Sequence, residues 1–439
     1  MRRVVITGLG MVTPLGLSTK ESWQNALLGK SGVRPIDPKL FFDPSSHDVQ
    51  IAGFNPDFDG VKILKGLLPK DEAGEDTTSE DNPQKKKLPS PRRMPRSTQM
   101  AIVAGFEAMK QSGLVITPEL ADDFGLYLGT GGGATDLYMD ATRTIDAKGP
   151  SRVSAFYSFQ LMPNNAAAMG ALIFGANGPV VHVSSACCTG NDAMRLAYQE
   201  IVLGRCKVVM TGGTEAAINS VVIASFANAR ALTKEFNDNP TAASRPFTLT
   251  RSGFVWGEGS VVFIFEELDH AQARGANILG EVLAAYATDD SFHETAPQPE
   301  GIGAQKAMRG ALKQASLEPE EIDLLSLHGT STPLNDKTES LAINRVFGER
   351  APSIPAFANK SRAGHLIGAS GPYSIAECLL SLRDKVVPPT LNYDDPDPDC
   401  QLNLSAKVQP LPVGSRIGLN NNAGFGGHNT CIIVSLFAR

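Results

Sequence analysis

The sequence predicts an α/β protein whose sheets are largely parallel and covered by helices on both faces. Short apolar runs typical of buried strands alternate with segments of helical periodicity. Corresponding segments of the two halves resemble each other, which indicates a duplicated unit. The chain has 439 residues, 42% of them hydrophobic, so it can bury a core larger than that of one small domain.

Five apolar runs predict the main strands of the first part of the chain. Each is short and bounded by Gly, Asp or Ser, as strands between helices usually are. Their continuous apolar character indicates burial on both faces. The runs are RRVVITGLG (2–10), DFGLYLGT (123–130), GPVVHVSSA (178–186), CKVVMTGGTEA (206–216) and GSVVFIFEEL (259–268).

The duplication is visible in two pairs of segments. AMKQSGL (108–114) precedes a strand that ends at Thr130, and ALKQASL (311–317) precedes LSLHGT, which ends at Thr330. Later in each half a strand leads into a turn of small residues that opens a helix, namely SSACCTG and NKSRAGHLIGASG. In such α/β units, sites form beyond the strand ends, so we expect loops of both halves to converge on one site.

One segment, residues 65–93, departs from this pattern. It is acidic and then basic, rich in Pro, Ser, Thr and Gly, and has no apolar periodicity. This composition predicts a partly mobile surface excursion.

Composition excludes several classes of function. A net charge of -6 provides no general attraction for nucleic acid, and no apolar run is long enough for a membrane span. Six cysteines without regular spacing favour a reducing compartment over a disulfide framework. The first residues enter a strand directly, which predicts a cytoplasmic protein, or a mitochondrial or plastid one whose transit peptide has been removed.

Adjacent cysteines, Cys187 and Cys188, lie where a predicted strand meets a predicted helix. Backbone amides at a helix start stabilise a thiolate, so this position can lower the pKa of Cys187 and make it a nucleophile. A buried structural cysteine is the ordinary alternative.

Partners for such a nucleophile occur in the second half. His328 and His365 lie in strand-end loops among Gly, Ser and Thr, which leave room for a substrate. The glycine-rich loop GFGGHN around Phe425 can bring backbone N–H groups close to a developing oxyanion. These residues favour nucleophilic catalysis with proton transfer or anion stabilisation by imidazoles.

The motifs together resemble the beta-ketoacyl-[acyl-carrier-protein] synthases, elongating condensing enzymes with the thiolase fold, over nearly the whole chain. The resemblance implies a duplicated five-layered αβαβα fold with halves at 1–255 and 256–439, and a homodimer. The motifs are VITGLGMVTPLG, SSACCTG, ARALT, NDNPTAASRPF, RSGFVWGEG, HGTSTPLND, KSRAGHLIGASG, LRDKVVPPTLNYDDPDPDC and GFGGHN.

The resemblance also implies roles for the site residues. Cys187 carries the acyl chain as a thioester, whereas Cys188 is a small neighbour. His328 and His365 hold the malonyl thioester carbonyl, so that loss of carbon dioxide leaves a stabilised enolate. The amides of Cys187 and Phe425 bind the acyl carbonyl oxygen. Lys360, paired with Glu339, organises the site electrostatically.

Substrate contacts follow from the same resemblance. Thr330 and Thr332 match hydroxyls that bind the phosphopantetheine arm, and Phe226 and Gly132 are assigned to substrate binding. Gly132 lacks a side chain where relatives limit the acyl pocket, which predicts room for medium to long chains. No metal or organic cofactor is implied, because the thioesters carry the activation.

Acyl carrier protein, loaded with acyl or malonyl groups, is the implied partner. Carrier proteins are acidic, so the basic run KKKLPSPRRMPR (85–96) is a candidate docking surface, with a solvated loop as the alternative. The expected reaction elongates a fatty acyl chain by two carbons. A catalytic ketosynthase of a type II polyketide or aryl-polyene pathway is the alternative that these motifs leave open.

Overall fold

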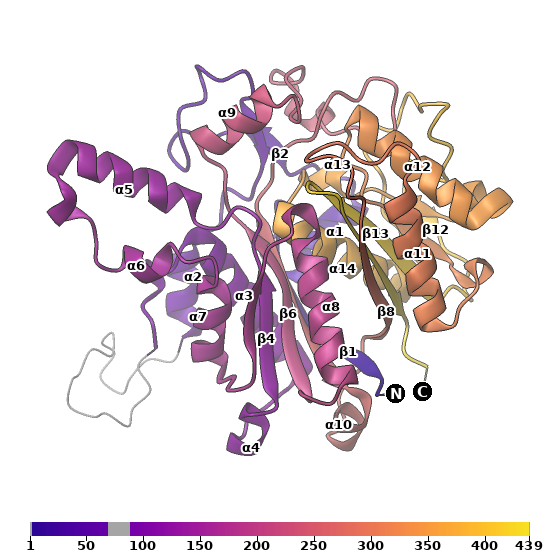
Figure 1. Cartoon of the computed structure of the whole chain (residues 1–439), viewed down its shortest axis with the longest axis horizontal. Helices are drawn as coiled ribbons and strands as arrows, with labels where there is room; N and C mark the ends of the chain where they lie inside the picture. The colour runs from indigo at the N-terminus through magenta and orange to yellow at the C-terminus, as the bar shows by residue number, and fades with distance from the viewer. Residues whose placement is uncertain (1, 69–87, 439) are drawn as a thin grey trace.

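A computed structural model describes residues 2–68 and 88–438 and contains one large mixed sheet of ten strands (Figure 1). The strand order is β10-β9-β13-β14-β8-β1-β7-β6-β4-β5. The strands are β1 (Val4–Val12), β4 (Phe124–Gly129), β5 (Val180–Val183), β6 (Val208–Glu215), β7 (Gly259–Glu267), β8 (Gly280–Asp289), β9 (Leu324–Ser326), β10 (Ala356–Phe357), β13 (Ile417–Gly424) and β14 (His428–Ser435).

Strand pairing demonstrates the predicted duplication. In the first five-stranded unit, β1 is antiparallel to β7, β7 to β6, while β6, β4 and β5 run parallel. The second unit repeats this pattern as β8, β14, β13, β9 and β10. The antiparallel pair β1 and β8 joins the units edge to edge. All five strand runs predicted from the sequence are therefore confirmed, together with the repeated unit. The prediction of a largely parallel sheet is wrong, because five of the nine strand pairs in the ten-stranded sheet are antiparallel. Strand β5 is also partly exposed rather than buried on both faces, because it lies at the edge of the sheet.

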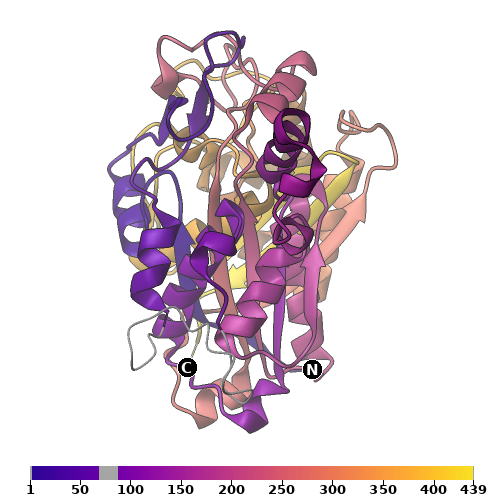
Figure 2. The same cartoon turned by 90° about the vertical axis from the view of Figure 1, so that its left-hand side faces the viewer.

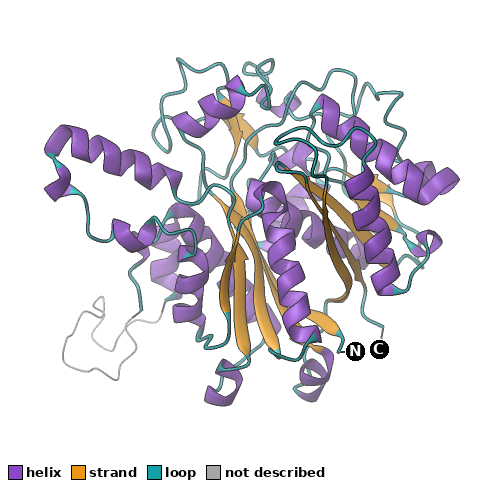
Figure 3. Ribbon diagram, in the orientation of Figure 1, coloured by secondary structure: helices purple, strands orange, loops and turns teal. Residues whose placement is uncertain are grey.

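Helices cover both units and also separate them (Figure 3). On the first unit, α3 and α7 pack against one face, and α11 with α12 covers the second unit. Between the units, α8 packs against α14, and each also contacts strands. This order gives the alternating helix and strand layers. The bounds are α3 (Arg96–Ser112), α7 (Asn165–Phe174), α8 (Thr189–Val202), α11 (Ile302–Ala315), α12 (Pro333–Phe347) and α14 (Ser370–Asp384).

The remaining elements lie around this framework. Helices α5 and α6 extend away from the sheet at the left of Figure 1, whereas both termini lie at the same end of the molecule in Figures 1 and 2. None of the helices in the described ranges combines the length and apolar character needed to cross a membrane. Their bounds are α1 (Thr19–Leu27), α2 (Gly60–Leu67), α4 (Pro118–Ala121), α5 (Thr135–Lys148), α6 (Tyr157–Gln160), α9 (Ser220–Asn228), α10 (Leu268–Ala273), α13 (Lys360–Ala363), β2 (Val33–Pro35), β3 (Ile51–Gly53), β11 (Val386–Val387) and β12 (Gln409–Pro410).

Two boundaries expected from the sequence change in the structure. The expected division at 255/256 falls just before β7, and the pairing of β7 with β1 and β6 places the division after this strand. The excursion expected at 65–93 begins as the end of helix α2 and ends in a 3₁₀ turn at Pro91–Arg93, while residues 69–87 lie outside the described ranges. The composition of residues 65–93 did not indicate these two helical ends, because each contains too few residues to show a helical period.

A close approach at Gly190 allows α8 to meet the start of α14. A Cβ atom at this position would lie 2.4 Å from Pro372 and 2.5 Å from the carbonyl oxygen of Gly368. Since the proline ring and backbone cannot move aside easily, glycine is required for the two central helices to touch.

We expect Gly190→Ala to lower the free energy of unfolding by about 1–3 kcal/mol, because the added methyl group overpacks this contact. The midpoint of urea unfolding measures the change. Gly66→Ala is the matched control: Gly66 lies in α2 with open space around it, so alanine should stabilise by about 0.5–1 kcal/mol. A Gly190→Ala protein as stable as the wild type would refute the packing argument.

Candidate active site

The two halves present equivalent strained turns at the centre of the molecule. Ala186, directly before Cys187, has φ +50°, and Ile367, shortly after His365, has φ +42°. Each turn immediately precedes a central helix, α8 or α14. Left-handed backbone at a residue with a side chain costs on the order of 1–3 kcal/mol and is concentrated at functional sites. Cys187 and His365 therefore both lie at strained turns, one from each half of the chain.

The structure brings Cys187, His328 and His365 together from three separate segments. Nε2 of His365 lies 2.9 Å from Sγ of Cys187, and the imidazole rings are 5.5 Å apart at 84°. One nitrogen from each ring and the thiol sulfur all lie within 4.8 Å of one another. His328 follows β9, His365 precedes α14 and Cys187 precedes α8, so both halves contribute to one site.

Burial determines the protonation of these groups. Burial raises the pKa of the Cys187 thiol to about 11, although the nearby Lys360 charge and the N–H groups of Phe425 and Cys187 act in the opposite direction. The lowered pKa expected from the helix start is therefore wrong, because desolvation outweighs the helix amides. Burial and Lys360 hold the pKa values of His328 and His365 well below the usual range, so both imidazoles are neutral near pH 7.

Lys360 and Glu339 surround His328 without touching each other. Nζ of Lys360 donates to the backbone oxygen of His328 at 2.5 Å. Glu339 accepts the backbone N–H groups of His328 at 2.7 Å and Gly329 at 2.8 Å, and the amide of Asn421 at 2.8 Å. Burial lowers the pKa of Lys360 to about 8, and the Glu339 charge partly offsets this. Glu339 acts on Lys360 through its charge alone, so the expected pairing acts through space.

Hydrogen bonds fix the position of the proton on His365. The backbone N–H of Ile367 donates to Nδ1 at 3.1 Å, and the hydroxyl of Ser370 lies 2.7 Å from the same nitrogen. Since a backbone N–H can only donate, Nδ1 carries no proton and Nε2 does. Cysteine and histidine can both bind metal ions, and in the described ranges Cys187, His328 and His365 form the one cluster of possible metal ligands. In this tautomer, however, Nε2 of His365 offers no lone pair to a metal.

Phe425 links the nucleophile to an aromatic wall. It lies in the turn between β13 and β14, and its N–H and that of Cys187 both point at the thiol. Its ring stacks on Phe226 of α9 with centroids 6.1 Å apart, and Phe226 also packs edge-on against Trp256 at 4.8 Å. Phe226 therefore lies directly beside Phe425, and its assignment to substrate binding stays a prediction.

A buried carboxylate, Glu215, was not singled out in the sequence. It lies at the end of β6 and accepts N–H groups from Gly131 at 3.0 Å, Gly132 at 3.1 Å and Gly368 at 3.2 Å. Burial raises its pKa to about 7. The signal in the sequence is an acidic residue inside the apolar run CKVVMTGGTEA. Glu215 ties the loop after β4 to the turn that carries His365.

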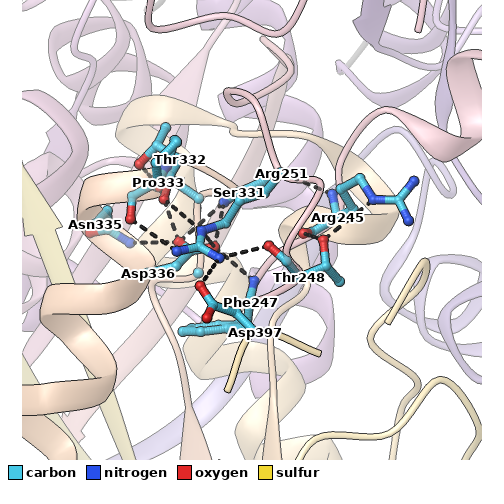
Figure 4. A network of polar contacts seen from close by, with 12 residues as sticks. Arg245, Phe247, Thr248, Arg251, Ser331, Thr332, Pro333, Asn335, Asp336 and Asp397 are labelled. Atoms are coloured by element: carbon cyan, nitrogen blue, oxygen red, sulfur yellow. Dashed lines mark hydrogen bonds and ion pairs between the residues drawn. The ribbon is translucent and has the colours of Figure 1, made fainter. Parts of the chain in front are cut away.

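The loop with Thr330 and Thr332 is held by a polar network (Figure 4). The two hydroxyls lie 2.9 Å apart, and buried Asp336 accepts the N–H groups of Ser331 at 3.2 Å and of Phe247 at 2.8 Å. Arg251, part of the same network, donates to Asp397 at 2.6 Å. This contact joins the network to the segment after β11. Both threonine side chains are thus held just before α12, and their binding of the carrier arm stays a prediction.

Comparison with known families identifies the chain. A model of the beta-ketoacyl synthase N-terminal domain matches residues 1–271, and one of the C-terminal domain matches residues 279–394. The chain belongs to the beta-ketoacyl synthase family. The two matched ranges also place the boundary after β7, in agreement with the strand pairing.

Relatives match over almost the full length of the synthase. It is 38% identical to the 3-oxoacyl-[acyl-carrier-protein] synthase 2 of Synechocystis sp., covering 98% of this chain and 97% of the relative. It is also 38% identical to the enzyme of that name in Staphylococcus aureus, covering 99% of both. A solved ketosynthase in complex with a type II polyketide acyl carrier protein is 28% identical, with a TM-score of 0.86 and coverage of 99% and 100%. The predicted family, thiolase-like fold and condensing acyltransferase class are confirmed.

Two sequence-based assignments change with the geometry of the synthase. A Cβ atom at Gly132 would lie 2.9 Å from Glu215 and 3.0 Å from Ala217, so this glycine faces the buried carboxylate rather than open space. In the basic run, Arg96 forms an ion pair with Glu258 at 2.5 Å, whereas Arg92 and Arg93 are exposed. Lys85, Lys86 and Lys87 lie outside the described ranges.

We expect iodoacetamide to modify Cys187 at a rate that rises with pH and reaches no plateau below about pH 10, because the thiolate is the nucleophile and burial disfavours it. Mass spectrometry of the labelled peptide measures the rate. Cys187→Ser provides the background, since its neighbour Cys188 is fully buried. A plateau already reached near pH 7 would mean that the amides and Lys360 overcome the desolvation.

Proposed function

We propose that this synthase elongates a fatty acyl chain by two carbons, using acyl and malonyl groups carried on acyl carrier protein. The observation that carries the proposal is the convergence of Cys187 with His328 and His365, with Nε2 of His365 at 2.9 Å from the thiol. A thiol can hold an acyl group as a thioester, and neutral imidazoles beside it can serve the malonyl group without reacting covalently.

The first half-reaction transfers the acyl group to Cys187. Its sulfur attacks the carrier thioester, the bond from the carbonyl carbon to the carrier sulfur breaks, and the carrier thiol is released. The N–H groups of Cys187 and Phe425 point at this position and stabilise the oxyanion of the tetrahedral intermediate. Thr330 and Thr332, held by the Asp336 network, bind the arm of the carrier.

The second half-reaction condenses the two groups. The malonyl thioester lies between His328 and His365, and the Nε2–H group of His365 donates to its carbonyl oxygen. Loss of carbon dioxide then leaves an enolate, whose carbon attacks the Cys187 thioester and releases the cysteine sulfur. The thioesters supply the activation, so the residues need no metal or organic cofactor for this chemistry.

The pathway follows from the relatives. Identity of 38% over nearly the whole chain to 3-oxoacyl-[acyl-carrier-protein] synthase 2 proteins favours fatty acid elongation. The structural neighbour at 28% identity belongs to a type II polyketide system, which keeps a polyketide ketosynthase as the second candidate. Comparing turnover of fatty acyl and polyketide starter thioesters by the purified protein decides between them.

We further propose that the synthase is a cytoplasmic homodimer. Within the described ranges, the edge strand β5 is partly exposed and pairs with no strand on its outer side. Exposed apolar side chains also occur on α5, on α7, which packs against β5, and in the segments on either side of α6. A second copy that pairs along this edge would cover them. Free thiols on all six cysteines fit a reducing compartment. The exposed residues include Tyr138, Ile145, Phe156, Met162, Leu172 and Val180.

Cys187→Ala should abolish acyl transfer, because Cys187 supplies the thiol that clusters with the two imidazoles, whereas Cys188→Ala should remain active. Cys188 is buried, and its sulfur contacts the backbone oxygens of Asn422 and His428 instead. Mass spectrometry after incubation with an acyl-carrier thioester locates the adduct. An adduct on Cys188 that survives in the Cys187→Ala protein would overturn the assignment.

Arg92→Glu, combined with Arg93→Glu, should raise KM for acyl carrier protein several-fold and leave a small thioester substrate unaffected, because the charge attracts an acidic partner. Arg93 also lies over the ring of Phe156 at 3.8 Å, so its replacement removes packing as well as charge. Arg92→Glu alone therefore tests the charge without this loss of packing. Lys20→Glu, at an exposed position of α1, is the control with the same change of charge as Arg92→Glu alone. If every variant has the wild-type KM for acyl carrier protein, the basic run is a solvated loop and not a docking surface.

A further inference from the structure

An apolar groove of about 690 Å³ lies on the surface of the second unit, and its lining does not include the thiol or the imidazoles. Three segments form its walls: residues 292–299 after β8, one side of α12, and residues 398–401. Phe292 and Leu334 are 56% and 63% exposed although both side chains are large and apolar. A groove of this size and lining is typical of sites for small apolar ligands. The further apolar members are Pro297, Pro299, Leu341 and Pro398.

The proposed dimer leaves this groove free. The edge strand β5 lies at one end of the ten-stranded sheet, in the first unit. Helices α11 and α12 lie side by side on the second unit, at the right of Figure 1. A second copy that pairs along β5 is therefore on the other unit, and Phe292 and Leu334 stay available to a different ligand.

Helix α11 borders one end of the groove. The side chain of Gln298 accepts the backbone N–H of Ile302 at 3.1 Å, so the helix begins directly beside the wall at 292–299. Ile302 is itself 43% exposed and extends the apolar surface. Lys306 follows one turn farther along the helix and is exposed. This places a cation near the α11 end of the groove.

Arg309 supplies a second cation at the same end. It donates to the backbone oxygen of Arg345 at 2.7 Å, and Arg345 directly follows Asn344, which lines the groove. The neighbouring carboxylate of Glu300 is already engaged, because it pairs with Arg345. Lys306 and Arg309 therefore present positive charge to a ligand rather than to this carboxylate.

An ion pair within the lining leaves the middle of the groove without net charge. Lys337 of α12 pairs with Asp399 at 2.7 Å and so joins two of the walls. The available positive charge is thus concentrated at the α11 end. An acidic helix of a partner protein would need cations along its whole length, whereas a single head group needs them at one end only.

We propose that the groove binds one alkyl chain that carries an anionic head group, with the chain along Phe292, Leu334 and Leu341 and the head at Lys306 and Arg309. Burial of the chain supplies the binding energy, and the cations fix its direction. A carboxylate and a phosphate share this head-group chemistry, so a fatty acid and an alkyl phosphate both fit. The site goes beyond the proposed function, because it uses neither the thiol of the catalytic centre nor a thioester.

A dodecanoate analogue with a diazirine on its chain locates the site on the intact chain. After irradiation, mass spectrometry should find saturable labelling of peptides that contain residues 292–299 and α12, and excess dodecanoate should prevent it. Cys187→Ala should show the same labelling of these peptides, because the groove is separate from the thiol. Absence of label from them, label that excess dodecanoate does not displace, or loss of the label in Cys187→Ala would overturn the proposal.

Calorimetry tests the apolar wall. Leu334→Asp should raise the Kd for dodecanoate about tenfold, because it places a carboxylate against the alkyl chain. The side chain is mostly exposed and lies in the first turn of α12, where an acidic residue is tolerated, so folding is preserved. Leu203→Asp is the matched control, since Leu203 is 62% exposed at the end of α8. A wild-type Kd in Leu334→Asp would refute the site.

The head group has its own test. Lys306→Glu should raise the Kd for dodecanoate about threefold and leave the Kd for uncharged dodecanol unchanged. Lys313→Glu is the control, because it makes the same change of charge one turn beyond Arg309 on α11. Dodecyl phosphate measured beside dodecanoate shows which head group the cations prefer.

Two results would contradict this assignment. If dodecanol binds as tightly as dodecanoate and Lys306→Glu changes neither, the ligand carries no anionic head. If acyl carrier protein without its arm displaces the photoreactive analogue while dodecanoate does not, the groove is a docking surface for an acidic protein helix instead.

Discussion

The antiparallel pairing of β1 with β8 is the interaction on which the site depends. It joins two copies of the same five-stranded unit through Val4, Val5 and Ile6, which face Val282, Glu281 and Gly280. Because the copies meet edge to edge, the turns before α8 and α14 arrive at the same place. Neither half could form this centre alone, since the thiol comes from the first and both imidazoles come from the second.

Burial of the centre then sets its chemistry. Desolvation keeps the imidazoles neutral and the free thiol protonated, so reactivity depends on where individual protons lie rather than on fixed charges. Lys360 is the exception, a buried ammonium whose pKa is lowered to about 8 and whose charge is supported by Glu339 from a distance. A site of this kind can stabilise an oxyanion strongly, because its N–H groups act where water does not screen them.

The duplicated scaffold carries an asymmetric pair of histidines. His365 sits in the turn equivalent to that of Cys187, where the N–H of Ile367 holds its Nδ1. His328 follows a strand, and the amide of Asn422 contacts its Nδ1. The two rings therefore have different hydrogen-bond partners at Nδ1, and such partners commonly set histidine tautomers.

The sequence by itself determined the fold class, the repeat and the candidate reactive residues. Continuous apolar runs and the echo between 108–130 and 311–330 predict the strands and the duplication, because these patterns are local. The motifs around Cys187, His328 and His365 predict the family for the same reason. The tertiary structure alone decided the raised pKa of Cys187, the separation of Lys360 from Glu339, the direction that Gly132 faces and the contacts of Glu215 and Asn422. Each of these depends on desolvation, or on contacts between segments far apart in the chain, and neither leaves a local pattern in the sequence.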